Sequence, residues 1–390
     1  DGQVFALTGA YNFNTDAFWK NFLRDLELGQ LDNTEGYVCA TVPQTGPAGI
    51  GFISMLGWGN AVTILPEMMY RQFGDEEALP RQYESMKLFV EAEIRKMGKK
   101  NLWIGPSLGD WLAMGKGIAW QAMHNNPVSN AFIVHDLKVI SETAERLGKR
   151  EDAARYRRQL AATTDAYIKK FVSKNGIVAK DYQSAYIMAL KYVLPEGELR
   201  ERVKKNFVAN IRKNGLQTGF FATEHLLPLL VEAGEQKLAY DVLLQENCPG
   251  WMYQVKCGAT TTWERWDALK PDGTVNEEKM AGSGENMVSF NHYAFGSVGE
   301  FYYQYILGIR PEKPGFAKLH FAPYPDERLG GVSGSYLSVA GKIESAWRYE
   351  ADGCHIRLAT PVEAVVLLPD GRSENVPAGT YEWTVKRPNL

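Results

Sequence analysis

The stretch FIVHDLKVISETAERLG, residues 132–148, followed closely by EDAARYRRQLAATTDAYIKKF, residues 151–171, decides the fold of this chain. In the first stretch, apolar side chains recur every three or four residues. In the second, Ala153, Tyr156 and Tyr167 fall on one stripe. This spacing is typical of amphipathic helices, and the glycine that closes the first stretch ends its helix. Two helices joined by so short a turn predict an antiparallel helical hairpin.

The same pattern continues from residue 1 to about residue 310 and predicts eleven helices. The other nine cover residues 1–10, 16–28, 60–73, 80–98, 182–193, 197–213, 222–233, 235–246 and 293–307. In the second of these, Phe18, Phe22 and Leu26 are expected on the buried face. Successive antiparallel pairs indicate an (α/α)6 barrel, a toroid of six hairpins, or a helical solenoid, which the lack of a sequence repeat disfavours. Six hairpins need twelve helices, so the odd count predicts that the partner of the first helix lies upstream.

The sequence changes character after about residue 308, where proline and glycine become frequent. In KIESAWRY, residues 342–349, Ile343 and Trp347 alternate with charged side chains, which indicates a half-buried strand. HIRLATP, AVVLLPDG and YEWTV predict further strands. The fold class is therefore mainly α, with an (α/α)6 barrel over residues 1–312 followed by a small C-terminal β-sandwich over residues 313–390.

Composition excludes several functional classes. The net charge of -3 argues against a nucleic-acid binder, which needs a basic face, and no apolar run approaches the ~18 residues of a membrane helix. The six histidines are dispersed without an HExxH motif, and no P-loop, GxGxxG or GxSxG motif is present, so no metal or cofactor is expected. Aromatic residues make up 12%, which suits either a sugar-binding cleft or a large core.

The segment GATTTWERWDA, residues 258–268, places the carboxyl group of Glu264 between Trp263 and Trp266. If the segment is extended, Thr262, Glu264 and Trp266 share one face. An indole beside a carboxyl group excludes water and raises its pKa, which suits proton transfer near neutral pH. In the alternative, Glu264 pairs with a basic residue and only fixes a loop.

Three further candidates lie in segments that are not convincingly helical. Asp110 precedes Trp111, and a carboxylate beside a ring is suited to clamp a sugar; the alternative is an aspartate that caps the next helix along the chain. His292 begins an apolar helix as either a site residue or a capping or core histidine. Trp58, flanked by two glycines, faces a cleft or lies beneath a turn. Carboxylates and aromatic rings without a cofactor point to glycoside chemistry.

Together these segments resemble the bacterial α-L-rhamnosidases of glycoside hydrolase family 78. The most specific segments are GATTTWERWDA and NMVSFNHYAFGSVGEFYYQYILGI, residues 286–309. The stretches that begin DGQVFALTGA, GWGNAVTILP, GDWL and GFFATEHLLP resemble the family in the same order, so the resemblance covers essentially the whole chain. It implies an (α/α)6 barrel, a C-terminal β-sandwich and hydrolysis of carbohydrates with a terminal α-L-rhamnose by an inverting mechanism.

The resemblance also implies roles for individual residues. Glu264 falls on the general base that activates water, and Asp1, which belongs to the catalytic centre, Asp110 and His292 fall on residues that bind sugar hydroxyls. The further residues expected at the rhamnose pocket are Trp58, Trp111, Trp263, Arg265 and Trp266.

The chain departs from the family pattern in two places. It opens with Asp1, so the general acid, which the resemblance places seven residues earlier, and further β-domains are expected upstream on the same polypeptide. Asn60 stands where the family usually has aspartate. A polysaccharide lyase or another exo-glycosidase on the same toroid, or a catalytically incomplete rhamnose-binding chain, therefore remain alternatives. A periplasmic or secreted location is expected.

Overall fold

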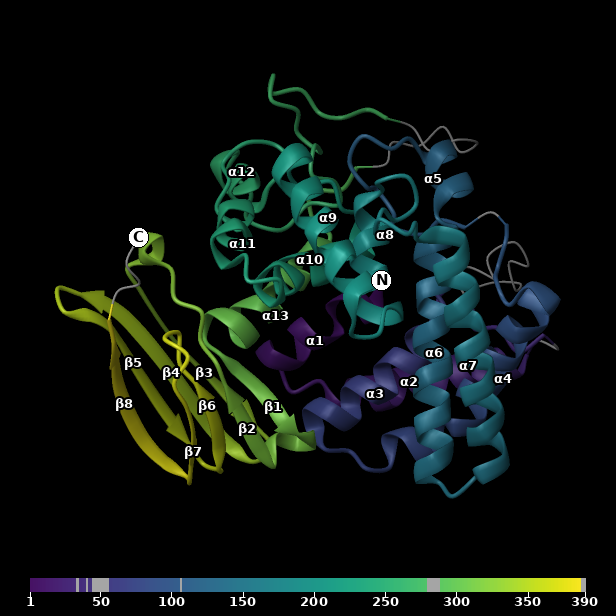
Figure 1. The fold of residues 1–390 in the computed structure, drawn as a ribbon, viewed down its shortest axis with the longest axis horizontal. Coiled ribbons are helices and arrows are strands. Elements are labelled where there is room, and N and C mark those ends of the chain that lie inside the picture. The colour runs from purple at the N-terminus through teal and green to yellow at the C-terminus, as the bar shows by residue number, and fades with distance from the viewer. Residues whose placement is uncertain (33–34, 40, 44–55, 106, 279–287, 387–390) are drawn as a thin grey trace. The chain divides into compact units, whose positions relative to one another are not determined.

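The structure is a computed structural model that describes residues 1–32, 35–39, 41–43, 56–105, 107–278 and 288–386. Its first three hundred residues are mainly helical (Figure 1). The α-helices are α1 Gly2–Asn12, α2 Asp16–Leu31, α3 Ala61–Phe73, α4 Ala78–Met97, α5 Ile118–His124, α6 Asn126–Arg146, α7 Arg150–Phe171, α8 Gln183–Met188, α9 Glu198–Asn214, α10 Phe220–Glu232, α11 Gln236–Leu243, α12 Trp251–Lys256 and α13 Gly299–Phe301. Short 3-10 or π turns are η1 Gly98–Lys100, η2 Ala189–Val193, η3 Ala294–Val298, η4 Tyr302–Ile306, η5 Pro314–Phe316 and η6 Glu327–Leu329.

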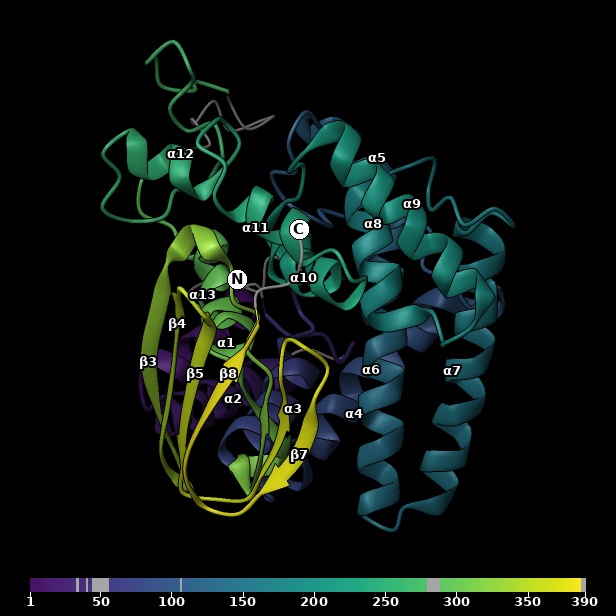
Figure 2. The ribbon, with the colours of Figure 1, turned by 60° about the vertical axis from the view of Figure 1, so that its left-hand side comes forward.

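Three helical hairpins follow one another along the middle of the chain. In α6, 16 of 21 residues are buried, whereas in its partner α7 only 4 of 22 are buried. The same alternation relates the fully buried α8 to α9, and α10, with 11 of 13 residues buried, to α11. Figures 1 and 2 show α6 and α7 side by side along their whole length. An inner helix buried nearly all round, paired with an outer amphipathic helix, is the arrangement expected of an α/α barrel.

The C-terminal strands form two four-stranded sheets. The strands are β1 Ile309–Lys313, β2 Lys318–Phe321, β3 Gly331–Ser338, β4 Gly341–Glu350, β5 Gly353–Thr360, β6 Ala364–Leu367, β7 Ser373–Val376 and β8 Gly379–Val385. Their orders are β1-β2-β6-β7 and β3-β4-β5-β8, and all neighbours are antiparallel except β2 and β6. In β4, Ile343, Ser345 and Trp347 are buried, which confirms the alternation predicted for residues 342–349.

The described residues divide into two compact units. One contains 1–4, 20–65 and 79–296, and the other contains 5–19, 66–78 and 297–390. The division at residues 312 and 313 stays a prediction; β1, which pairs with β2, includes both of these positions. All the predicted site residues belong to the first unit. None of the helices in the described ranges is both long and apolar enough to cross a membrane.

All eleven predicted helices are present, with two corrections. The buried stripe of α2 runs through Trp19, Leu23 and Leu26, and Phe18 is exposed, so the predicted face was wrong by about one residue. The helices α5 and α12 were missed, so eleven is not the full count of helices among the described residues, and an upstream partner for the first helix stays a prediction.

Candidate active site

Glu264 lies at the end of a short extended segment that pairs with residues 289–292. The Glu264 N–H donates to the Ser289 carbonyl at 2.9 Å, and the His292 N–H donates to the Thr262 carbonyl at 2.9 Å. The Thr262 hydroxyl donates in turn to the His292 carbonyl at 2.6 Å. Two segments about 30 residues apart in sequence are thereby held side by side, and they carry the predicted base, Glu264, and the predicted substrate contact, His292.

The Glu264 side chain is half-buried. Burial raises the pKa of Glu264 above its ordinary value, and the neighbouring charge of Arg265 opposes that rise. Among the described residues, no ion pair holds the Glu264 carboxylate, so the alternative of a purely loop-fixing salt bridge finds no partner there. A carboxyl group whose pKa is raised by its surroundings can accept a proton from water more readily than an exposed one.

His292 presents a defined ring nitrogen toward Asp1. The Ala294 N–H donates to His292 Nδ1 at 3.2 Å, so in the neutral ring the proton resides on Nε2. His292 Nε2 lies 3.9 Å from Asp1 Oδ2. Burial lowers the pKa of His292, which favours the neutral ring. The structure therefore brings the His292 Nε2–H donor close to the Asp1 carboxylate, although these two predicted site residues lie far apart in the sequence.

Trp58 sits in a tight turn over residues 56–60 and packs against the start of α10. Its ring centroid lies 4.6 Å from that of Phe221 and 6.1 Å from that of Phe220. Gly57 has a φ of +93°, and a Cβ there would approach Phe221 Cε2 to 2.7 Å, so the turn requires glycine. The Trp58 indole N–H is buried and has no hydrogen-bond partner among the described residues.

Asp110 is fully buried and caps α10. Its Oδ2 accepts a hydrogen bond from the Gly219 N–H at 2.8 Å, and its Oδ1 accepts from the Phe221 and Ala222 N–H groups at 2.7 and 3.1 Å. Acceptors at a helix N-terminus satisfy N–H groups that have no partner within the helix. The predicted alternative, a cap on the next helix, is wrong in its helix, because that helix, α5, has Gly117 as its N-cap. Hydroxyl binding by Asp110 stays a prediction that its contacts with α10 do not favour.

Trp111 is buried beside the same helix start. Its carbonyl accepts a hydrogen bond from the Phe220 N–H at 3.1 Å. A Cβ on Gly219 would lie 2.2 Å from that carbonyl oxygen, so the close approach depends on glycine. The segment with Asp110 and Trp111 therefore fixes α10, whose first residues carry the aromatic floor of the site.

Phe220 and Phe221 form that floor and were not predicted from the sequence, because the predicted helix began at residue 222. The Phe220 ring centroid lies 4.9 Å from that of His292, and Phe221 packs on Trp58. Both phenylalanines are nearly completely buried. The one available signal was a glycine followed by two aromatic residues at a helix start, which by itself is also typical of an ordinary core.

The two tryptophans that bracket Glu264 are core residues. Trp263 is buried and meets Phe290 edge-on at 5.2 Å. Trp266 is fully buried, stacks on Phe295 at 3.9 Å, and donates from Nε1 to the Thr218 carbonyl at 2.8 Å. The shared face of Glu264 and Trp266 was predicted on the condition of an extended segment, and that condition fails because the chain bends at Glu264 and Arg265 and turns at Trp266. A pocket role for either indole stays a prediction that its burial does not favour.

Arg265 is also buried and serves the loop. Its guanidinium donates from Nε to Asp267 Oδ1 at 2.9 Å and from Nη2 to Glu278 Oε2 at 2.8 Å. It lines a cavity of about 200 Å³ together with Gln121 and residues 112–117. The contact between Arg265 and sugar stays a prediction. The hydrogen bonds to Asp267 and Glu278 fix the position of Arg265, which is adjacent to Glu264 in the sequence.

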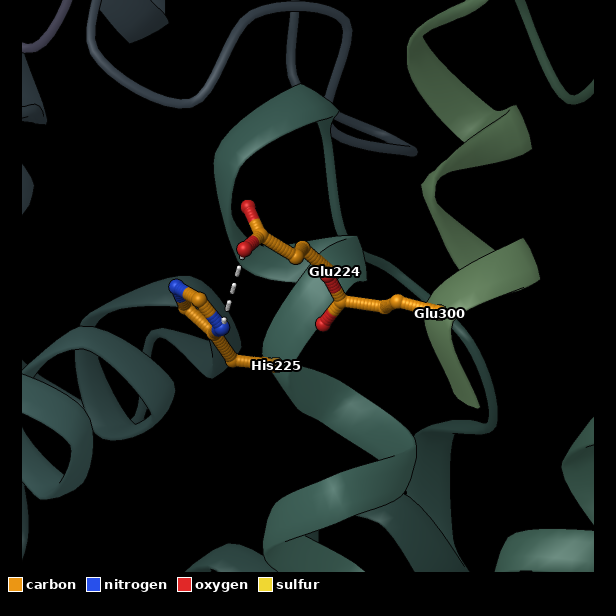
Figure 3. A group of neighbouring side chains, drawn as sticks. All are labelled: Glu224, His225 and Glu300. Carbon is orange, nitrogen blue, oxygen red and sulfur yellow. Dashed lines mark ion pairs between the residues drawn. The ribbon is translucent and has the colours of Figure 1, made fainter. Parts of the chain in front are cut away.

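A second pair of titratable groups lies on α10 itself. Glu224 Oε1 is 3.8 Å from His225 Nδ1, as the dashed line in Figure 3 shows. Burial raises the pKa of Glu224 to about 7 and lowers that of His225 well below its usual range. The Tyr192 hydroxyl and His225 Nε2 are 3.1 Å apart. Nothing in the sequence pattern singled out this pair.

Two protein families match the chain. The family described as the bacterial alpha-L-rhamnosidase 6 hairpin glycosidase domain matches residues 1–306, and the bacterial alpha-L-rhamnosidase C-terminal domain matches residues 308–381. A curated alpha-L-rhamnosidase from Alteromonas sp. (strain LOR) is 32% identical over 370 residues, which is 93% of this chain and 39% of that relative. The chain thus spans about two fifths of the length of that relative.

Solved structures show the same relationship. The chain is similar to the alpha-L-rhamnosidase of Streptomyces avermitilis, complexed with L-rhamnose, with a TM-score of 0.89 and 29% identity over 99% of this chain and 38% of that one. It is also similar to the native enzyme of Aspergillus terreus, with a TM-score of 0.89 and 28% identity over 98% of this chain and 45% of that one.

Proposed function

The chain belongs to the bacterial α-L-rhamnosidase six-hairpin glycosidase family, and from that membership we propose that it forms the catalytic portion of an enzyme that removes terminal α-L-rhamnose from glycans or glycosides. The observation that carries the proposal is the pairing of the Glu264 segment with the His292 segment around a half-buried carboxyl group of raised pKa. The substrate is a carbohydrate, and no metal or cofactor enters the proposed mechanism.

The proposed reaction inverts the anomeric centre. Glu264 takes a proton from a water molecule, which attacks the anomeric carbon on the face opposite the leaving oxygen. A second carboxylic acid, which the resemblance places before Asp1, protonates that oxygen. The two carboxyl groups of an inverting glycosidase stand about 6.5–9.5 Å apart, so that water fits between one of them and the sugar. The released sugar is β-L-rhamnose.

Sugar binding is proposed for the groups that surround the aromatic floor. The His292 Nε2–H donates to a sugar hydroxyl, and the Asp1 carboxylate accepts from the same hydroxyl, since their separation of 3.9 Å leaves room for one oxygen that contacts both. The Trp58 indole is proposed to contribute its apolar ring face, and its N–H group has no partner among the described residues. A pyranose presents both kinds of surface, hydroxyl groups at its edge and C–H groups on its face.

The test is hydrolysis of an aryl α-L-rhamnoside by the wild-type protein and by Glu264→Gln, with the released anomer followed by proton NMR. We expect β-rhamnose from the wild type and a loss in kcat of about a thousandfold or more in the variant, since a general acid or base contributes about 10²–10⁴-fold. L-Rhamnose affinity, measured by calorimetry on both proteins, reports binding apart from turnover.

The outcomes separate the candidate functions. Equal turnover by the wild type and Glu264→Gln overturns the assignment of the base. Binding of L-rhamnose without any turnover by the wild type supports a rhamnose-binding chain that needs an acid from elsewhere. An unsaturated product that absorbs near-ultraviolet light identifies a lyase instead.

A further inference from the structure

Asn60 closes the turn that carries Trp58. Its Oδ1 accepts a hydrogen bond from the Gly57 N–H at 2.6 Å. The carbonyl group of Gly57 accepts a second hydrogen bond, from Gln3 Nε2 at 2.7 Å. Both backbone groups of Gly57 are therefore held by buried side chains, and the position of Trp58 follows from theirs.

The Asn60 amide is itself held by two acids in the barrel interior. Its Nδ2 donates to Asp136 Oδ2 of α6 and lies 3.4 Å from Glu93 Oε1 of α4. The Thr63 hydroxyl donates to Asp136 Oδ1 at 2.5 Å. These four side chains are at most 1% exposed. Asn60 thus links the Trp58 turn to the walls of the barrel.

The two acids repel each other when both are ionised, since two buried carboxyl groups in one polar cluster cannot both ionise without large repulsion. Burial and the neighbouring Asp136 raise the pKa of Glu93 well above its usual range. Burial raises the pKa of Asp136 as well, but His135, with Nδ1 at 3.6 Å from Asp136 Oδ1, and the hydrogen bonds from Thr63 and Asn60 oppose this. The hydrogen bonds that Asp136 accepts therefore favour its ionised form.

An amide meets the needs of both neighbours of Asn60. The Gly57 N–H needs an acceptor and Asp136 accepts from a donor, so one oxygen and one NH2 on the same short side chain satisfy both. An aspartate at this position would keep the acceptor, could donate to Asp136 only in its protonated form, and would bring a third carboxyl group beside Glu93 and Asp136. A buried acceptor facing a buried acceptor is strongly unfavourable.

We infer that Asn60 is a positioning residue for sugar binding, which holds Trp58 in place by joining the Gly57 backbone to the buried acids Asp136 and Glu93. The inference rests on the proposed function in one respect, that Trp58 belongs to the rhamnose pocket. Its structural part, the control of the Trp58 position by Asn60, is independent of any substrate.

The matched variants are Asn60→Asp and Asn210→Asp. Asn210 of α9 is also buried, donates from Nδ2 to the Asp181 carbonyl at 3.0 Å, and accepts from Gln183 Nε2 at 3.0 Å. The same substitution there removes the same donor in the same unit, and Asn210 has no contact with the Trp58 turn. Thermal unfolding of both variants measures the loss of stability that the two substitutions share.

The first readout needs no ligand. With 5-fluorotryptophan incorporated, the ¹⁹F NMR resonance of Trp58 is identified as the one missing in Trp58→Phe. We expect that resonance to shift in Asn60→Asp and to stay unchanged in Asn210→Asp. An unshifted Trp58 resonance in folded Asn60→Asp overturns the inference, whatever the protein binds. Should Asn60→Asp fail to fold, Asp136→Asn removes the charged acceptor from the other side, and an unshifted resonance there overturns it equally.

The second readout is calorimetric titration with L-rhamnose. Asn60→Asp should bind about tenfold more weakly than the wild type, which corresponds to about 1.4 kcal/mol. In the Trp58→Phe background the same substitution should change the affinity less than twofold, because the two residues act as a unit. A full tenfold effect in that background means that Asn60 does not act through Trp58. No binding by the wild type counts against the proposed function alone, since the ¹⁹F readout still decides the inference.

Discussion

Thr262 and His292 hold each other through two hydrogen bonds, one from the His292 N–H to the Thr262 carbonyl at 2.9 Å and one from the Thr262 hydroxyl to the His292 carbonyl at 2.6 Å. This double contact fixes the backbone on which the imidazole stands. Because Thr262 is two residues before Glu264, the same contact also fixes the distance between Glu264, the proposed base, and His292, which is proposed to bind a sugar hydroxyl.

Thr262→Val should weaken L-rhamnose binding about fivefold, since a neutral hydrogen bond contributes about 1 kcal/mol and the backbone at His292 loses one of two restraints. Calorimetric titration measures the change. Thr261→Val is the matched control, because the Thr261 hydroxyl donates to the Phe290 carbonyl at 2.5 Å on the exposed side of the same pairing. Equal affinities for the two variants would contradict the role given to Thr262.

Asp110→Ala should lower the free energy of unfolding by about 3 kcal/mol. The change removes a buried acceptor from three N–H groups at the start of α10, and hydrogen bonds to a charged group are stronger than neutral ones. Urea denaturation checks it. Asp272→Ala, which removes an exposed aspartate that accepts from Thr274 within a turn, should have a much smaller effect. A loss at Asp110 no larger than at Asp272 would rule out the capping role.

Arg265→Gln should shift the acidic limb of the pH profile of kcat/KM to higher pH. A base works in its ionised form, and the positive charge of Arg265 lowers the pKa of Glu264, against the larger effect of burial. Without that charge the pKa of Glu264 rises further, so a higher pH is needed to ionise it. Arg265→Lys retains the charge and is expected to shift the limb less. A shift toward lower pH in Arg265→Gln would reverse the assignment.

Glu224→Gln should flatten the dependence of stability on pH. Burial raises the pKa of Glu224 from its ordinary value of 4.5 to about 7, so the folded state binds more protons than the unfolded state between these values. Wild-type stability therefore falls as pH rises through that window, by about 3 kcal/mol for this group. Thermal unfolding across the window measures it. Glu142→Gln, at an exposed position of α6, should keep the wild-type slope; an unchanged slope in Glu224→Gln would exclude Glu224 as its source.

The sequence predicted the long helices well because periodicity over twenty residues is a strong signal, as in α6 and α7. The prediction was wrong where the helix is short or where two adjacent residues fit the periodicity equally well. The stripe of α2 could pass through Phe18 or Trp19, which are adjacent, and α5 and α12 have only seven and six residues. The edge strand β1 contains Pro311, which a strand in the middle of a sheet would not tolerate, so it gave no strand pattern.

The candidate site divides in the same way. Glu264, His292 and Trp58 could be singled out because unusual residue types stand together in short segments. The roles of Asp110 and Asn60 could not, because each depends on partners far away in the sequence. Asp110 caps a helix 109 residues later, and Asn60 meets an acid 76 residues later. Spacing within a segment carries no information on such contacts.

The cap that Asp110 places on α10 also sets the order in which the site can form during synthesis. Contacts between residues so far apart in sequence form late, because a long loop must close first. When Asp110 leaves the ribosome, α10 has not yet been made, and a further 109 residues must follow before Asp110 can contact Gly219. Until then the Asp110 carboxylate lacks these partners and Trp58 lacks the phenylalanine rings on which it packs. A nascent chain can therefore form the α6–α7 hairpin long before it can form the proposed sugar site.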